Sequence, residues 1–459
     1  MAQRCSSNSS SYGINLLGQL KVLHTYGQIL LGFPQPLGMT PGQLVHHVQA
    51  AAVKLYSAVP RLAGQVVFVE DSKAEMFRIA PFEQHQGLSP VRVRDMHDSL
   101  PAYEDMARAS FPIRMFPSEV SLTGLKSAPL NYIEDPGAVL PVLQISVLFI
   151  TGGVLVAFSL QHTCGDATGF GLVIEHFATL LRGESLSETL IAGANFEDVL
   201  TVPRLREGQE SVLDQSQKPA DSLSQSRHFF ASPDKPKIWF CVRFSAESLA
   251  RLKNAAKLDD AGAWISTNDA LTAFIWQRVT MARGPRISRG TGMTCCNRIS
   301  SARKLFNPPL REGLLGCLIR PVFCPLPAKK VLDSSLAELA TILRQTSRQL
   351  DDHALRSITS AMEKYPNTVP KWSPPSECDV TLQVSSVQWS HIRAHELSFG
   401  PLGRSQFARR IGSTPLAGSM YPLPKSANGD IEVQMCLWED DLVTLKQDEL
   451  WNEHAKFIG

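Results

Sequence analysis

The stretch Val154-Leu155-Val156-Ala157-Phe158-Ser159-Leu160-Gln161 runs directly into His162-Thr163-Cys164-Gly165-Asp166. Its apolar, partly β-branched composition predicts a buried strand. The strand would deliver His162 into a turn, with Asp166 at the start of a helix. A histidine at the end of a buried strand is held in place, and a neutral imidazole, whose pKa is about 6.5, accepts a proton at neutral pH. The motif HxxxD therefore offers His162 as a candidate general base.

A helix is expected directly after Asp166, ending near Gly183. Its apolar side chains recur at helical spacing: Phe170, Val173, Ile174, Phe177, Leu180 and Leu181. An aspartate at a helix N-terminus accepts hydrogen bonds from free backbone N–H groups and contributes about 0.5–2 kcal/mol. Capping is therefore one expected role of Asp166.

The segment 139–160 is apolar for about the length of a membrane span. It is interrupted by Thr151-Gly152-Gly153, a sequence typical of a hairpin turn, and its ends carry no lysine or arginine anchors. We therefore expect two buried strands here.

Other segments alternate between helix and strand. Thr40-Pro41-Gly42-Gln43 predicts a helix start, and the helix should run toward Tyr56. Residues 65–69 form a β-branched run that predicts a strand. The fold class indicated is α/β.

The second half begins after a polar, irregular stretch at 204–236 that suggests a linker. A strand at 238–244 and a helix through Leu249 and Leu252 follow it, and Ser266 opens another helix. The acidic-apolar segment 439–450 predicts one amphipathic helix at the C-terminus.

Length and composition limit the number of domains, the partners and the location that we expect. A chain of 459 residues exceeds one ordinary core, so we expect two or three domains. With 44% hydrophobic residues, 19% charged residues and a net charge of +2, nucleic acid is not indicated as a partner. The nine cysteines include no C-x-x-C pair, which favours reduced thiols, and no secretory signal is evident. The expected location is the cytoplasm.

Several blocks of sequence together resemble the BAHD acyltransferases, the CoA-dependent family that includes the fungal trichothecene O-acetyltransferases. The resemblance runs nearly end to end and depends on the order and spacing of the blocks. They are His162 to Asp166, Ile265 to Trp276, Asn307-Pro308-Pro309-Leu310 with Gly316, Trp389, Phe399-Gly400, Leu423-Pro424-Lys425, and Ile431 to Leu442.

The resemblance implies a two-domain α/β fold like that of chloramphenicol acetyltransferase, with mixed sheets and an active-site channel between the domains. It suggests an N-terminal domain at 1–205 carrying HxxxD, a crossover linker at 206–236 and a C-terminal domain at 237–459. A segment near 390–412 is expected to pack with the N-terminal domain. Acyl-CoA would be the co-substrate of a monomeric enzyme that has no permanently bound cofactor and no metal.

The family also implies roles for particular residues. His162 would deprotonate the acceptor, and Asp166 would support the turn by pairing with an arginine of the other domain. Arg303 is the first candidate for that arginine and Arg298 the second. Trp389 fits the donor to the oxyanion of the tetrahedral intermediate, while a structural tryptophan at the domain seam is the alternative.

The sequence departs from the family pattern at three places. Ala167 replaces a glycine, which a helix start tolerates. The signature DFGWG is altered to Ser398-Phe399-Gly400-Pro401-Leu402-Gly403, so Ser398, Phe399, Gly400 and Gly403 would support the CoA side only indirectly. Cys317 replaces an asparagine and is expected to fall on the supporting structure, away from the base.

The function expected is acyl transfer from a CoA thioester to a hydroxyl group of a small secondary metabolite. The altered segment 398–403 keeps alternatives open: a cyclase, isomerase or condensation enzyme on the same fold, or an acyl carrier protein as the donor. A silent binding protein is disfavoured by the intact His162 and Asp166. Cys164 as a nucleophile is disfavoured because nothing nearby in the sequence would lower the pKa of its thiol.

Overall fold

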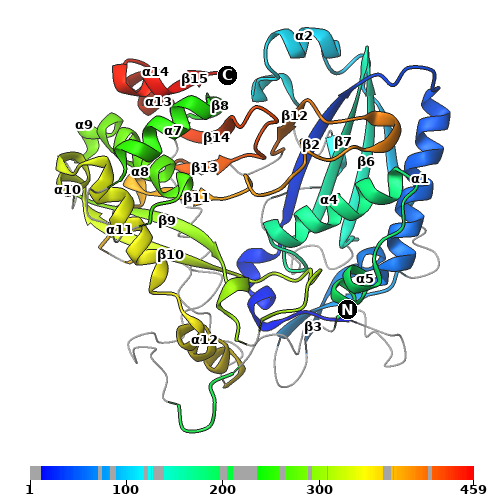
Figure 1. Ribbon diagram of the computed structural model, residues 1–459, viewed down its shortest axis with the longest axis horizontal. Helices are drawn as coiled ribbons and strands as arrows, with labels where there is room; N and C mark the ends of the chain where they lie inside the picture. The colour runs from blue at the N-terminus through cyan, green and yellow to red at the C-terminus, as the bar shows by residue number, and fades with distance from the viewer. Residues whose placement is uncertain are drawn as a thin grey trace.

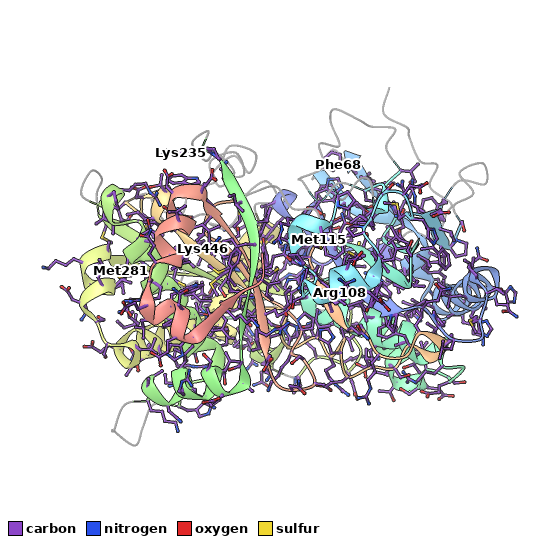
Figure 2. The ribbon with its side chains drawn as sticks, turned by 90° about the horizontal axis from the view of Figure 1, so that it is seen from above. Phe68, Arg108, Met115, Lys235, Met281 and Lys446 are labelled. Atoms are coloured by element: carbon purple, nitrogen blue, oxygen red, sulfur yellow. The ribbon has the colours of Figure 1, made fainter. Side chains whose placement is uncertain are left out.

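The computed structural model describes residues 12–70, 75–82, 89–117, 122–125, 127, 139–196, 204–209, 235–257, 264–287, 292–307, 309–364, 374–375, 377–411 and 416–459. Two halves lie side by side, each built on its own mixed sheet (Figure 1). Seen from above, Phe68, Arg108 and Met115 lie in the N-terminal half, and Met281 and Lys446 in the C-terminal half (Figure 2).

The N-terminal half contains a five-stranded sheet with helices on both faces. Its strands, in spatial order, are β12 (Phe407–Arg409), β2 (Tyr26–Pro34), β7 (Gly153–Gln161), β6 (Leu143–Ile150) and β5 (Val91–Asp95). Helices α1 (Pro41–Ala58) and α4 (Ala167–Leu181) pack on one face, and α2 (Tyr103–Arg108) packs on the other. Alternate residues of each strand enter these two cores, as the period of a strand requires.

The predicted hairpin is present at the centre of this sheet. Strands β6 and β7 pair antiparallel, and Gly152 in the turn has a φ of 75°, a conformation that glycine adopts without steric cost. Every residue of β7 is buried, because the sheet continues on both sides and is covered on both faces. A small sheet, β1 (Tyr12–Gly13), β4 (Glu75–Ala80) and β3 (Gln65–Glu70), and helix α5 (Glu188–Ala194) complete this half.

The C-terminal half contains a seven-stranded sheet. Its strands, in spatial order, are β10 (Ile319–Pro327), β9 (Met293–Ser301), β11 (Val384–Val387), β13 (Ser419–Pro422), β14 (Ile431–Trp438), β8 (Lys237–Phe244) and β15 (Ala455–Phe457). Its described helices are α7 (Ala246–Ala255), α8 (Thr267–Ala282), α9 (Gly284–Ile287), α10 (Ala328–Asp333), α11 (Leu336–Arg348), α12 (Asp352–Lys364), α13 (Glu439–Lys446) and α14 (Glu449–His454).

Two features join the halves. The chain leaves the C-terminal sheet after β11, adds β12 to the edge of the N-terminal sheet beside β2, and returns to β13 (Figure 1, orange). A separate apolar cluster packs Leu17 and Leu20 of the N-terminal half against Leu318 and against Leu355 of α12. Side chains from distant parts of the sequence therefore meet at the seam between the halves.

One sequence prediction is wrong at the C-terminus. The expected single helix at 439–450 is two helices, because α13 ends at Lys446 and Asp448 caps α14 by accepting a hydrogen bond from the Trp451 backbone N–H. The domain boundaries near 205 and 237 stay predictions, and residues 210–234 of the expected linker lie outside the described residues, as does Pro308.

Candidate active site

The backbone around His162 is fixed by the central strand. Gln161, the last residue of β7, pairs with Tyr26 of β2, and the His162 N–H donates to the Thr25 carbonyl oxygen at 2.8 Å. The ladder between β2 and β7 therefore extends one residue past the strand end. This hydrogen bond holds the imidazole at the point where the chain turns toward α4.

The ring of His162 is half-buried. Burial lowers the pKa of the imidazole; a hydrogen bond to the backbone of the same residue and the charge of Asp166 oppose that effect, and the charge of Arg410 adds to it. A lowered pKa keeps the ring neutral at pH 7, which a general base requires.

Cys317 lies beside the base, which contradicts the sequence expectation. Its Sγ atom is 3.7 Å from His162 Nδ1, and its side chain is fully buried. The expectation was wrong because Cys317 lies far from His162 in the sequence, and only the docking of the two halves brings them together. The thiol therefore lies on the Nδ1 side of the imidazole ring.

Asp166 is buried, with 1% of its surface exposed, and every hydrogen bond of its carboxylate is structural. Oδ1 accepts from the Gly169 N–H at 2.9 Å, which caps α4, and Oδ2 accepts from the Leu318 N–H at 2.9 Å. The carboxylate therefore fastens the start of α4 to the C-terminal half and makes no hydrogen bond to His162.

Arg303 completes this connection. Its Nη2 atom lies 3.0 Å from Asp166 Oδ1, and the guanidinium group also donates to the carbonyl oxygens of Leu314, Leu315 and Gly316. Gly169 allows the close approach, because a Cβ atom there would lie 2.8 Å from the Leu315 oxygen. The segment 314–316 is thereby held against the first turn of α4.

Arg298, the second candidate for this pairing, lies elsewhere. Its Nη1 atom is 2.8 Å from Asp269 Oδ1, and Arg344 pairs with the other oxygen of the same carboxylate. Asp269 also forms a capping box with Ser266 at the start of α8. Arg298 therefore belongs to a buried network inside the C-terminal half.

Trp389 lies at the seam, with 4% of its surface exposed. Its backbone N–H donates to Pro422, and its ring packs edge-on against Phe170 of α4, at 5.5 Å between centroids. The indole Nε1 is buried and has no hydrogen-bond partner among the described residues. A buried N–H group without a partner is costly, so this position fits a donor reserved for a ligand at least as well as a packing residue.

The altered segment 398–403 lies at the opposite end of α4. The Ser398 carbonyl oxygen accepts from Arg182 Nη1 at 2.9 Å, and Phe399 is fully buried against Phe33. Gly400 and Gly403 have φ values of 55° and 72° in the turn. Since α4 has 15 residues, it separates this segment from Asp166 by about 22 Å. The altered residues therefore bear on packing and not on the surroundings of His162.

Arg410 was not singled out by the sequence, although it follows β12 directly. Its guanidinium carbon lies 5.1 Å from the centroid of the Trp389 ring and 4.0 Å from that of Tyr421. Only 8% of the residue is exposed. No local motif marks such a position, because the rings and the arginine come from different strands and loops.

No group of three or more histidine, cysteine, aspartate or glutamate side chains in the described part of the chain is arranged to hold a metal ion. Nor does any described helix combine the length and apolar character needed to cross a membrane.

The two-sheet fold with a strand-end histidine at the seam defines a class of acyltransferases. A model of the Transferase family matches residues 121–451, and one of the trichothecene 3-O-acetyltransferase-like N-terminal domain matches residues 25–180. The chain belongs to the Transferase family, the BAHD acyltransferases, and is an acyltransferase.

Individual relatives agree with this assignment. The chain is 32% identical to the O-acyltransferase pigD of Monascus ruber, over 97% of this chain and 98% of that protein. It is 29% identical to the trichothecene 3-O-acetyltransferase TRI101 of Fusarium sporotrichioides, over the whole of both. The crystal structure of that TRI101 with coenzyme A and T-2 matches with a TM-score of 0.84 and 25% identity, over 98% of this chain and all of that one.

The structure of vinorine synthase matches with a TM-score of 0.64 and 16% identity, over 99% of this chain and 96% of that one, which supports the fold alone. The predicted fold class and family are confirmed by these comparisons.

Proposed function

We propose that this enzyme transfers an acyl group from a CoA thioester to a hydroxyl group of a small secondary metabolite, with His162 as the general base. The observation that carries this assignment is the His162 ring, fixed by the end of β7, half-buried, and kept neutral by a lowered pKa. An alcohol is almost entirely protonated at neutral pH, so a base in this position contributes roughly 10²–10⁴-fold to the rate.

The reaction needs one proton carrier and no covalent enzyme intermediate. Nε2 of His162 takes the hydroxyl proton as the acceptor oxygen attacks the thioester carbonyl carbon. The tetrahedral intermediate collapses with cleavage of the C–S bond, and the imidazolium returns its proton to the departing sulfur. The products are the ester and free CoA, and His162 is neutral again. The indole N–H of Trp389 is the proposed donor to the oxygen that becomes negative.

Asp166, Arg303 and the segment 314–316 keep the histidine turn in place. They act by position, because the hydrogen bonds of Asp166 join α4 to the C-terminal half and leave the imidazole alone. Arg298 has no part in this support.

Free acyl-CoA is the proposed donor, and an acyl carrier protein is the alternative that the experiment below decides. The TRI101 complexes contain coenzyme A, and that relative is similar over the whole chain. The altered segment 398–403 does not weigh against CoA, since it packs at the far end of α4. We also propose a cytoplasmic location, because the described cysteines, all buried, are free thiols. We propose a monomer because the two halves already cover each other's faces at the seam.

The test is calorimetric titration with acetyl-CoA and longer acyl-CoAs, for the wild type and His162→Ala. Turnover is then followed as release of the CoA thiol, with T-2, deoxynivalenol and other hydroxylated metabolites as acceptors and mass spectrometry to detect the acylated product. We expect both proteins to bind CoA and the wild type to turn over about 10²–10⁴ times faster. Absence of binding at every chain length would refute CoA as the donor. Equal turnover by the variant would refute His162 as the base.

A further inference from the structure

Arg410 and Arg409 are neighbours in sequence with opposite surroundings. Arg409 is buried and satisfied: it pairs with Glu432 and donates to the carbonyl oxygens of Ser110, Phe111 and Ala408. The guanidinium group of Arg410 forms no ion pair and no hydrogen bond with any described residue, and its Nε atom is buried. A buried N–H group of a charged side chain that has no hydrogen-bond partner carries a desolvation cost, which an oxygen of a bound ligand would relieve.

The cost is not relieved by a nearby acid. Glu432 of β14, which pairs with the adjacent Arg409, is the carboxylate that one would expect to pair with Arg410. Arg243 and Arg409 already hold it. The backbone of Arg410 is fixed instead by Gln434, which accepts from its N–H at 3.1 Å and donates to its carbonyl oxygen at 2.9 Å. Trp389 and Tyr421 lie against the guanidinium plane, which holds the cation through cation–π contacts and fixes its orientation.

A second unpaired donor lies beside it. The indole Nε1 of Trp389 is buried without a partner, and the guanidinium carbon of Arg410 is 5.1 Å from the centroid of that ring. The positive charge of Arg410 also acts on the base, because it contributes to lowering the pKa of His162. Two donors that have no partner among the described residues, one of them on a charged side chain, thus lie together at the seam.

We propose that Arg410 and Trp389 together form an oxyanion-binding site beside His162, which stabilises the carbonyl oxygen of the thioester as it becomes negatively charged. This inference rests on the proposed function. The negative charge on the carbonyl oxygen exists only during the reaction. The two donors therefore carry a desolvation cost in the resting protein, and their interaction with the oxyanion offsets that cost in the transition state, as electrostatic preorganisation requires. Arg410 accordingly becomes a catalytic residue, and Tyr421 a positioning residue that holds its guanidinium plane.

The first test compares stability, with no substrate present. Arg410→Met removes an unpaired charge and keeps the apolar stem, so its melting temperature should equal or exceed that of the wild type. Arg409→Met is the matched control at the adjacent position. It should melt at a lower temperature, because it removes one of the two arginines that hold Glu432 and leaves three carbonyl groups without their donor. A melting temperature for Arg410→Met that falls as far as that of Arg409→Met would overturn the proposal, since Arg410 would then be structural.

The second test measures kcat and KM with acetyl-CoA, together with the slow hydrolysis of acetyl-CoA by water, which forms the same oxyanion without an acceptor. Arg410→Met should lower kcat about 10²–10³-fold with little change in KM, and Arg410→Lys should retain part of the rate. An unchanged kcat would overturn the proposal. So would a change confined to KM for donors bearing a carboxylate, such as succinyl-CoA, because the arginine would then recognise a permanent acid.

The two tests separate this inference from the proposed function. A wild type that consumes no thioester, with or without an acceptor, would refute the acyltransferase mechanism at this site. The melting temperatures of the two methionine variants would still decide whether Arg410 is an unpaired charge or a structural one.

Discussion

Two buried aspartates at helix starts, Asp166 and Asp269, illustrate how the same chemistry serves different ends. Each lies in the first turn or at the cap of its helix, accepts a backbone N–H, and pairs with an arginine at 3.0 Å or 2.8 Å. The partners of Asp269 all lie within the C-terminal half. Asp166, by contrast, joins α4 to Leu318 and Arg303 across the seam.

The difference teaches that an HxxxD aspartate can be essential without touching the reacting atoms. Asp269 stabilises one sheet and its helices. Asp166 sets the position of the turn that carries His162 relative to the other half, including Cys317 at 3.7 Å.

Replacing either aspartate should destabilise the fold, but only one replacement should damage catalysis. Asp166→Asn and Asp269→Asn each break a buried ion pair, which costs about 3–5 kcal/mol in the free energy of unfolding. We expect kcat to fall in Asp166→Asn and to stay near the wild-type value in Asp269→Asn. Denaturant unfolding and initial rates at a temperature where both variants are folded measure the two effects. A parallel loss of kcat in Asp269→Asn would remove the distinction.

The far end of α4 should respond in stability and not in chemistry. Gly400 has a φ of 55°, and a Cβ atom there would lie 2.5 Å from the Leu181 carbonyl oxygen. Gly400→Ala should therefore lower the free energy of unfolding by more than the roughly 1–2 kcal/mol that a left-handed conformation costs. Gly183→Ala is the control, because Gly183 has a φ of 82° and open space around it. The measurement is the melting temperature of each variant, with kcat unchanged in both; a lower kcat in Gly400→Ala would instead connect this turn to the site.

The smallest effect concerns pH. Burial lowers the pKa of His162, so kcat/KM should be full at neutral pH and fall only below the ordinary histidine range, as the base becomes protonated. The negative charge of Asp166 raises that pKa. Asp166→Asn should therefore shift the acidic limb of the profile to lower pH, whereas Asp269→Asn should leave it in place. A shift in the opposite direction would contradict the electrostatic assignment.

Local patterns were sufficient for the elements near the base. The capping box at Thr40 and Gln43 predicted α1, the Thr-Gly-Gly turn predicted the β6–β7 hairpin, and the apolar spacing after Asp166 predicted α4. The C-terminal helix was predicted less well, because the apolar spacing of 439–450 continues through Asp448, which starts a new helix. Periodicity does not distinguish a cap inside a pattern from an exposed residue of one helix.

The family, the base and the local shape of its turn could be predicted from the sequence, since these depend on residues close together in the chain or on blocks in a fixed order. The contacts between the halves show which arginine meets Asp166 and that Cys317 lies beside His162. They also place Arg410 between Trp389 and Tyr421, with no ion pair to any described residue. Those contacts join segments far apart in sequence, and they exist because β12 crosses to the N-terminal sheet and the two halves dock. Long-range partners depend on that docking, and no local spacing encodes it.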